Sequence, residues 1–208
     1  MAELRVVDHP LLSRHLAVLR DASTSREAFR RAMGEAAAVL AYEAMRDVEL
    51  VQLTIATPLE ETEAARPALP VAVVAILRAG LGMVDGFLRQ VPEADIGHLG
   101  MYRDEESLKP VPYYESLPAS LPAASVFVVD PMLATGGSAS AAITRLREAG
   151  ATRLHLVSLV AAPEGVATVQ AAHPDVPITV AALDRQLDER GYIRPGLGDA
   201  GDRLFGTE

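Results

Sequence analysis

The sequence predicts an α/β fold, in which a doubly wound, mostly parallel sheet carries N-terminal helices and a C-terminal hood or loop. Two continuous apolar runs, at residues 71–77 and 126–129, are typical of strands covered on both faces. Segments with helical spacing alternate with such runs, which is typical of parallel βαβ units. Ligands of these sheets bind beyond the carboxyl ends of the strands. The polar residues that follow each strand are therefore the first candidates for a site.

The first seventy residues carry three local signals. Thr24-Ser25-Arg26-Glu27 has the spacing of a capping box and predicts a helix that runs to about Met45. Residues 48–58 alternate apolar and polar side chains, which predicts a half-exposed strand. Residues 60–70 are acidic and then proline-rich, which predicts a loop.

From residue 71 onward strands and helices alternate. We expect strands at 71–77, 95–101, 126–129, 154–160 and 178–183, and helices at 80–88, after 138 and at 165–172. The segment 102–122 is charged at first and then rich in proline, so we expect a mobile, lid-like excursion there.

Composition limits the class of protein. At 208 residues the chain suits a single domain, residues 1–208, with a C-terminal segment from about 184 to 208 as its hood. Without Cys it has no disulfides or thiolate metal sites. The formal charge of −9 argues against nucleic-acid binding, which needs a basic face. The N-terminus does not read as a secretory signal and no apolar run suits a membrane span, so we expect no membrane association and a cytoplasmic location.

The most informative segment is the strand–loop–helix unit at residues 126–138. Asp130 ends the apolar strand, and a loop with Thr135, Gly136, Gly137 and Ser138 follows and opens an Ala-rich helix. Glycines allow a close backbone approach to a ligand, and hydroxyls beside a helix start make a phosphate cradle. An acid beside that cradle suits sugar hydroxyls. Together these features predict a ribose-5-phosphate site.

Val128-Val129-Asp130 followed by Ala134-Thr135-Gly136-Gly137-Ser138 resembles the phosphoribosyl diphosphate (PRPP) loop of the type I phosphoribosyltransferases, and the whole segment is similar to that of their uracil branch. Many members of the wider superfamily carry two adjacent acids here, whereas this chain has Pro131 in the second place. The resemblance implies the type I phosphoribosyltransferase fold and a PRPP site. The residues it assigns to PRPP are Asp130, Pro131, Met132, Leu133, Ala134, Thr135, Gly136, Gly137 and Ser138.

A second segment, Arg78-Ala79-Gly80-Leu81-Gly82, directly follows a predicted buried strand. Taken alone it is a surface Arg in a tight turn. Beside the PRPP-like loop it resembles the diphosphate-binding loop of the same family, in which Arg78 and nearby N–H groups would bind the leaving diphosphate. A planar guanidinium with several donors suits that task.

A third segment is Met101-Tyr102-Arg103, which three acids follow. A solvated charged loop is the ordinary interpretation. In the family, an Arg after Tyr in this loop is associated with PRPP, so the resemblance implies a PRPP-binding and catalytic role for Arg103. Closure of the loop would also exclude water from the activated sugar.

The C-terminal segment from Gly191 to Thr207 is rich in glycine yet carries considerable apolar bulk, which a frayed tail would lack. It resembles the uracil-recognition loop of the family. The resemblance implies that the backbone at Ile193, Gly198, Asp199 and Ala200 recognises the base, and that Asp199 also approaches PRPP in a catalytic role. Backbone donors and acceptors matched to uracil would leave cytosine with buried mismatches, which are costly.

Taken together, the resemblance implies that uracil and PRPP react to give UMP and diphosphate, with Asp130, Arg103 and Asp199 as catalytic residues. Mg²⁺ would arrive with the diphosphate rather than on a protein metal site. The family also suggests a homo-oligomer and, in some members, activation by GTP. Two other interpretations stay open: transfer to another base such as a purine, and a non-catalytic regulator that keeps the fold and binds RNA or a nucleotide.

Overall fold

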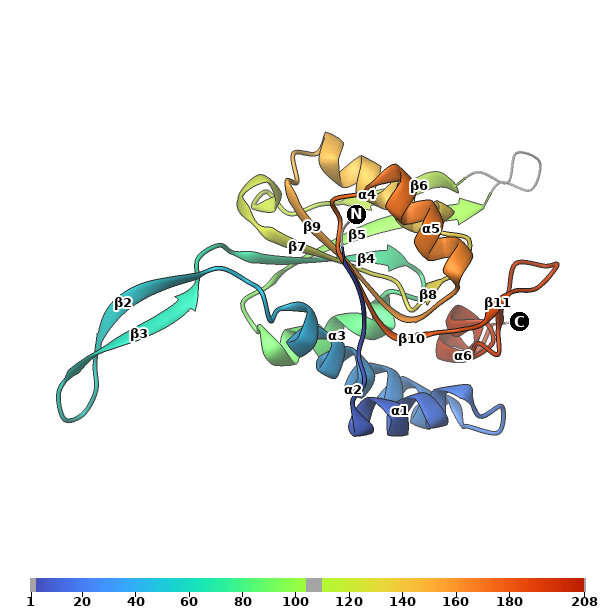
Figure 1. Ribbon diagram of the computed structural model, residues 1–208, viewed down its shortest axis with the longest axis horizontal. Helices are drawn as coiled ribbons and strands as arrows, with labels where there is room; N and C mark the ends of the chain where they lie inside the picture. Colours follow the sequence, from blue (N-terminus) through green and yellow to red (C-terminus); the bar gives the residue numbers. More distant parts are fainter. Residues whose placement is uncertain (1–2, 104–109, 208) are drawn as a thin grey trace.

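A computed structural model describes residues 3–103 and 110–207 (Figure 1). The central strands are β1 (Leu4–Val6), β4 (Val71–Leu77), β5 (Asp95–Arg103), β6 (Pro110–Ser116), β7 (Ser125–Val129), β9 (Arg153–Ala161) and β10 (Ile178–Leu183). They lie in the order β1-β10-β9-β7-β4-β5-β6, and the short β8 (Met132–Leu133) pairs with β9. All these pairings are parallel except that of β6 with β5. The predicted mostly parallel sheet is confirmed.

Helices cover both faces of the sheet, as a doubly wound fold requires (Figure 1). Three of them, α1 (Pro10–Arg20), α2 (Arg26–Ala44) and α3 (Leu81–Gln90), lie on one face, and α4 (Gly137–Glu148) and α5 (Pro163–Ala172) lie on the other. Each face has its own buried cluster: Phe29 and Phe87 belong to the first, and Ile143 and Leu146 to the second. A short 3₁₀ helix, Leu121–Ala123, precedes β7.

The continuous apolar runs form the buried strands that they predicted. Residues 71–76 of β4 are all buried, and β7 is buried from residue 126 to residue 129. Because both faces are covered, neither strand shows an alternating pattern. Their carboxyl ends therefore have a rigid base for the residues that follow.

The capping box predicted at Thr24 is wrong by one residue. Ser25 is the N-cap of α2, and its side chain accepts a hydrogen bond from the N–H of Ala28. The Thr24 hydroxyl donates instead to the carbonyl of Val18 at 2.7 Å. The α1–α2 connection thus uses the Thr24 side chain, which leaves the capping role to the next residue.

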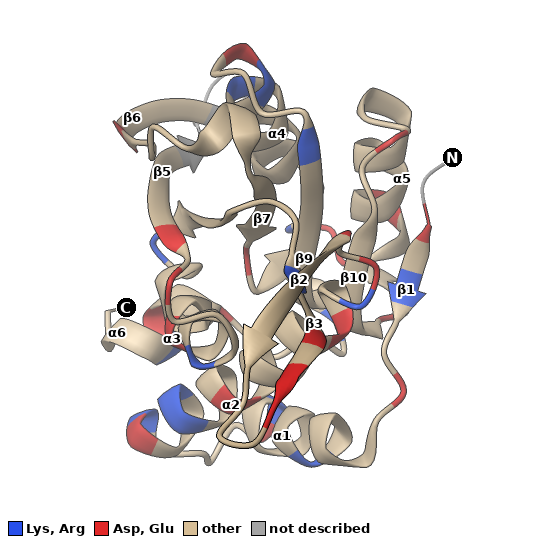
Figure 2. Cartoon of the chain, turned by 90° about the vertical axis from the view of Figure 1, so that its left-hand side faces the viewer, with Lys and Arg blue, Asp and Glu red and all other residues tan. Residues whose placement is uncertain are grey.

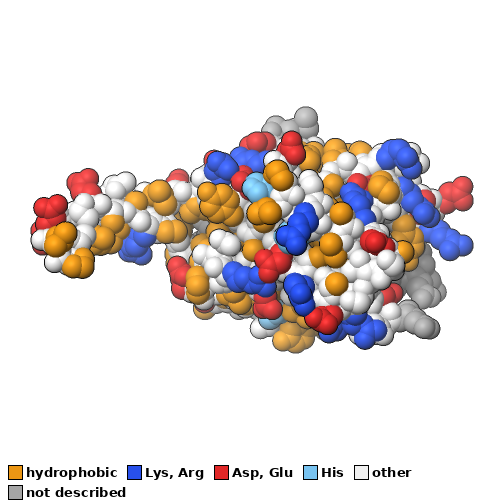
Figure 3. Space-filling view, turned by 90° about the horizontal axis from the view of Figure 1, so that it is seen from below, with side chains coloured by type: hydrophobic (Ala, Val, Ile, Leu, Met, Phe, Trp, Pro, Cys, Tyr) orange, Lys and Arg blue, Asp and Glu red, His pale blue; other side chains and the backbone are white. Residues whose placement is uncertain are grey.

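The loop predicted at residues 60–70 is also wrong, because most of it is a strand. The strands β2 (Leu50–Ala56) and β3 (Glu61–Pro67) pair in antiparallel register along their whole length. They form an arm that projects away from the body of the molecule (Figures 1 and 3). Nearly all arm residues are exposed, so β2 is not half-buried as predicted. Acidic positions lie along β3 (Figure 2), where solvent accommodates them without disturbing the pairing.

The excursion predicted at residues 102–122 contains regular structure. β6 returns along β5 as an antiparallel edge strand, with Glu115 opposite Leu99 and a register shift after Gly100. Prolines are tolerated here because one side of an edge strand needs no ladder hydrogen bonds. Residues 104–109, the centre of the predicted lid, lie outside the described residues.

The C-terminal segment forms the short hairpin β11 (Gln186–Leu187) and β12 (Ile193–Arg194), followed by α6 (Ala200–Phe205). Leu204 and Ala200 of α6 are buried in the same cluster as α2. The segment is therefore anchored on the face that carries α1 to α3. Within the part of the chain that the structure describes, no helix is both long and apolar enough to cross a membrane.

Candidate active site

The candidate residues gather at the carboxyl edge of the sheet. Arg78 directly follows β4 and Asp130 directly follows its neighbour β7. The turn at Gly80 packs tightly against the end of β7, since a Cβ there would lie 2.6 Å from the carbonyl oxygen of Val129. Only glycine permits this approach. The two predicted loops are therefore held side by side.

Asp130 lies half-buried at this edge. Burial raises the pKa of its carboxyl group to about 7, and one long hydrogen bond of 3.5 Å from the Met132 N–H opposes the shift only weakly. An acid with such a pKa at the carboxyl end of a strand is typical of functional sites. It is also poised to accept donors such as sugar hydroxyls, because the protein itself gives it few.

Beyond Asp130 the loop is tied to β9 before it reaches α4. The Pro131 carbonyl accepts hydrogen bonds from the N–H groups of Leu159 and Val160, and the Leu133 carbonyl accepts one from Ala162. The Leu133 side chain is buried in the core. These contacts fix the loop, so the residues after it start from a defined position.

Gly136 is the N-cap of α4, with φ of 81° and no side-chain capping bond. A Cβ at Gly136 would lie 2.6 Å from the Gly165 carbonyl oxygen, so the position requires glycine both in conformation and in space. The first turn of α4 contains no acid. The N–H groups of Gly137 and Ser138, together with the helix dipole, form a start suited to an anion, and Thr135 beside it is exposed.

Arg78 reaches from the β4 end toward the C-terminal segment. Its Nη2 lies 3.5 Å from Oδ1 of Asp202 and its Nη1 lies 3.4 Å from Oγ1 of Thr207. Its guanidinium lies 5.9 Å from the centre of the Phe205 ring. The side chain is 54% exposed, so most of its hydrogen-bonding capacity is available to a ligand.

Asp199 lies close to the same place. It is the N-cap of α6, and its Oδ1 accepts a hydrogen bond of 2.9 Å from the N–H of Asp202. A Cβ on Gly201 would lie within 4 Å of both the Asp199 carboxylate and the Arg78 guanidinium. The structure thus brings Asp199 and Arg78 together, although 120 residues separate them in the sequence.

The predicted base loop is a turn between β12 and α6. Ile193 belongs to the buried core and is 3% exposed as a whole residue, so its side chain is not available to a ligand. Arg194, the next residue in β12, points the other way and pairs with Asp188, with 2.8 Å from Nε to Oδ2. Gly198 is exposed with φ of 79°, and Ala200 is buried at the start of α6.

Arg103 is the last residue of β5, and its side chain lies outside the described part of the structure. Its predicted role therefore stays a prediction. Sequence reasoning assigned no role to Arg20 or Arg203, two arginines that contact the C-terminal turn. Nothing local in the sequence indicated these contacts, because Arg20 reaches the turn from the end of α1 and Arg203 reaches the end of α1 from α6.

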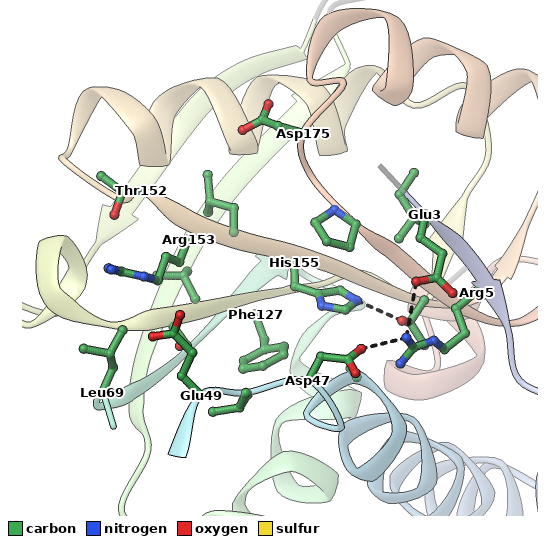
Figure 4. Close-up of a pocket in the computed structure, with 18 residues that line it drawn as sticks. Glu3, Arg5, Asp47, Glu49, Leu69, Phe127, Thr152, Arg153, His155 and Asp175 are labelled. Carbon is green, nitrogen blue, oxygen red and sulfur yellow. Dashed lines mark hydrogen bonds and ion pairs between the residues drawn. The ribbon is translucent and has the colours of Figure 1, made fainter. Parts of the chain in front are cut away.

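A cavity of about 430 Å³ lies at the opposite edge of the sheet, where Ser125 and Arg153 begin β7 and β9 (Figure 4). His155 in this cavity stacks on Phe127 at 5.6 Å, and its Nε2 lies 2.8 Å from the hydroxyl of Thr179. Burial lowers the pKa of His155 to about 4, so the ring is neutral at physiological pH.

The charged groups of this cavity are largely engaged with one another. Arg5 donates to Asp47 at 2.7 Å and to Glu3 at 3.3 Å, and it also bonds the Glu43 carbonyl at the end of α2 (Figure 4). The Asp47 bond leads the causes that raise the pKa of Arg5. The predicted motifs do not line this cavity, and its ion pairs link β1 to the end of α2. Among residues 3–103 and 110–207, no group of three or more His, Cys, Asp or Glu side chains is arranged to hold a metal ion.

Comparison with solved structures places this fold in a class. A hypoxanthine-guanine phosphoribosyltransferase from Bacillus anthracis shares the fold, with a TM-score of 0.52 over 76% of this chain and 80% of that chain, at 14% identity. The fold, with its strand–loop–helix unit at Asp130, is that of a type I phosphoribosyltransferase.

Closer similarities define the family. The sequence profile described as uracil phosphoribosyltransferase matches residues 6–207. A uracil phosphoribosyltransferase from Salinibacter ruber is 59% identical over 207 residues, which are 100% of this chain and 99% of that protein. A solved structure from Aquifex aeolicus has a TM-score of 0.94 and 35% identity over 99% of both chains. The chain belongs to the uracil phosphoribosyltransferase family, whose members are pentosyltransferases.

Proposed function

We propose that this protein transfers the phosphoribosyl group of PRPP to uracil, which yields UMP and diphosphate and so salvages the base. The observation that carries the proposal is the meeting of three features at one edge: Asp130 before the start of α4, Arg78 at the end of the neighbouring strand, and α6 of the C-terminal segment against Arg78. Family membership supports the substrates. We further propose that residues 1–208 act as one domain, with residues 184–208 as the base-binding segment.

In the proposed reaction, N1 of uracil forms a bond to the anomeric carbon while the bond from that carbon to diphosphate breaks. Diphosphate leaves with the electron pair of the broken bond, and the N1 proton passes to solvent. Positive character develops on the sugar, so the ionised Asp130 carboxylate beside the ribose hydroxyls stabilises it. The protein otherwise acts by holding the two substrates in line.

The phosphate groups have separate binding places in this proposal. The loop of Asp130 to Ser138 holds ribose 5-phosphate: Ala134, Thr135, Gly136, Gly137 and Ser138 contact the phosphate, while Pro131, Met132 and Leu133 fix the loop on β9. Arg78 and Arg103 bind the leaving diphosphate, and Asp199 approaches PRPP from the C-terminal side. The free start of α4 and the exposed Arg78 side chain support this division.

Uracil recognition is proposed to use backbone groups of Ile193, Gly198, Asp199 and Ala200. Ile193 is buried and the Arg194 side chain pairs with Asp188, so neither side chain is free to recognise the base, which supports recognition by backbone groups. A carbonyl facing N3–H and amides facing the exocyclic oxygens would select uracil over cytosine.

Mg²⁺ is proposed to accompany the diphosphate of PRPP, since Mg²⁺ keeps several waters and needs few protein ligands. When bound there it would neutralise charge on the leaving group. The carboxylates of Asp130 and Asp199 are the groups nearby that could complete its shell through water. Activity measured with PRPP and Mg²⁺, with excess chelator as the comparison, tests this part.

We also propose that the protein works as a homo-oligomer. The β2–β3 arm exposes Leu50, Val51, Ile55 and Leu59, the last at 95%, and an isolated two-stranded hairpin is only marginally stable in water. Contact with another copy would cover these side chains. Sedimentation of the intact protein and of an arm-deleted variant tests it. Activation by GTP and a cytoplasmic location are proposals that rest on the family resemblance and composition, and an assay with and without GTP tests the first.

Diphosphate release from PRPP and Mg²⁺, with uracil, cytosine, hypoxanthine or no base, tests the main proposal. We expect release with uracil alone, accompanied by UMP, and a strong loss of turnover in a folded Asp130→Asn variant. Release with another base would keep the PRPP site and refute the base assignment. Binding of PRPP without release of diphosphate in the presence of any base would refute the proposed transferase activity.

A further inference from the structure

The C-terminal turn has no regular structure of its own, so its shape depends on its anchors. Gly196 is at the centre of the turn with φ of 64°. Its N–H donates to Oδ2 of Asp184 at 2.9 Å, and its carbonyl accepts from Nη1 of Arg20 at 2.8 Å. Both polar backbone groups of one residue are thus held by one pair of side chains.

Arg20 and Asp184 are themselves joined by two hydrogen bonds, of 2.8 Å from Nη1 to Oδ2 and 2.6 Å from Nη2 to Oδ1. The Asp184 side chain is 5% exposed and that of Arg20 is 26% exposed. Such two-pronged Arg–carboxylate pairs fix geometry as well as charge. Arg20 is the last residue of α1 and Asp184 directly follows β10, so the pair holds the turn against a helix and a central strand.

A second arginine connects the same turn to the same end of α1. Arg203 of α6 donates from Nη1 to the carbonyls of Leu197, at 2.7 Å, and Leu19, and from Nη2 to that of Asp21 at 2.6 Å. Its guanidinium lies over the Phe29 ring at 4.2 Å. Arg20 and Arg203 therefore both connect the C-terminal turn to the end of α1.

We propose that Arg20 and Asp184 are positioning residues for base recognition: the pair holds the Gly196 backbone so that the neighbouring backbone groups face the base. This inference rests on the proposed function of the turn. Neither side chain has a described contact with the loop at residues 130–138 or with Arg78. The pair should therefore affect the affinity for uracil more than that for PRPP, to which the turn contributes only through Asp199.

Steady-state kinetics of Arg20→Gln, Arg20→Lys and Asp184→Asn test the proposal, with each substrate varied in turn and cytosine as a competing base. Hydrogen bonds to charged groups are worth about 1.5–3 kcal/mol, so we expect KM for uracil to rise about ten-fold or more in Arg20→Gln and Asp184→Asn. KM for PRPP rises less than KM for uracil. Arg20→Lys, which keeps the charge and one bond, gives a smaller rise.

Arg147→Gln is the control, because Arg147 also pairs with a carboxylate away from the turn, its Nη2 lying 2.5 and 2.6 Å from the two oxygens of Asp175. It should leave both KM values unchanged. Circular dichroism melts identify folded variants, and Arg20→Lys serves if Asp184→Asn does not fold. An unchanged KM for uracil in folded variants, or an equal rise in both KM values, overturns the positioning role. A wild-type protein that does not use uracil refutes the proposed function instead.

Discussion

Replacing Asp130 by Asn should stabilise the ligand-free protein at neutral and alkaline pH. Burial raises the pKa of this carboxyl group from 3.8 to about 7. Below pH 4 both the folded and the unfolded chain hold the proton, and Asp130 does not affect the difference between them. Between pH 4 and 7 the unfolded chain ionises while the folded chain does not, so stability falls as pH rises, and above pH 7 the full loss remains.

The size of the effect follows from the shift. About three pH units at about 1.36 kcal/mol each give at most about 4 kcal/mol, and because the half-buried side chain keeps some hydration we expect about 2–4 kcal/mol. Asp130→Asn does not lose this stability, so its free energy of unfolding should exceed that of wild type by almost nothing at pH 4 and by about 2–4 kcal/mol at pH 8.

Urea denaturation of both proteins between pH 4 and 8 measures the difference. The difference between the two proteins is the informative quantity, because His155 titrates in an overlapping range with the opposite sign and flattens the wild-type profile. A pH-independent difference between wild type and Asp130→Asn would refute the raised pKa. A less stable Asn variant at pH 8 would show that the ionised carboxylate is well solvated or paired in the folded protein.

Three further predictions follow from named contacts. The lowered pKa of His155 should by itself remove up to about 3 kcal/mol of stability as pH falls from 6.5 to about 4, against the opposite contribution of Asp130. His155→Gln should therefore gain stability relative to wild type over this range in the same urea titration. Asp202→Asn removes the carboxylate that competes with a bound diphosphate for Arg78. Because the Arg78–Asp202 pair is exposed, the free energy of unfolding should change by less than about 1 kcal/mol, while calorimetry should show PRPP binding about two- to five-fold more tightly. Weaker PRPP binding would contradict this competition for Arg78. Gly136→Ala places a Cβ at positive φ against the Gly165 carbonyl, which should cost about 1–3 kcal/mol in a thermal melt and raise KM for PRPP, with KM for uracil as the internal control.

The predictable parts of the fold were those in which one local signal sufficed. Residues 71–77 form β4 as predicted, because a strand buried on both faces has to be apolar throughout. The arm shows the reverse case. Glu61–Pro67 pairs fully with β2 although it buries no face, so neither alternation nor hydrophobicity could mark it as a strand.

The site shows the same division between local and distant information. The glycine at 136 and the acid at 130 could be placed from sequence, because their roles depend on a strand end and a helix start only a few residues away. The ties of the C-terminal turn could not, since Arg20 and Asp184 are separated by 164 positions. The position of Asp184 directly after a strand was a local signal that its side chain has a role, but that signal does not identify Arg20 as the partner.

The raised pKa of Asp130 would reduce the repulsion that an acidic protein presents to an anionic substrate at this edge. With a pKa of about 7 the carboxyl group is about half protonated in the free protein at pH 7, so a phosphate approaching the start of α4 meets less than a full negative charge. Ribose hydroxyls donating to the carboxylate would then favour its ionised form and lower the pKa. PRPP binding at pH 7 should therefore release up to about half a proton that Asp130→Asn does not release. Calorimetry in two buffers of different ionisation enthalpy measures this difference, and net proton uptake by wild type relative to the variant would show that the carboxyl group faces the phosphate rather than the sugar.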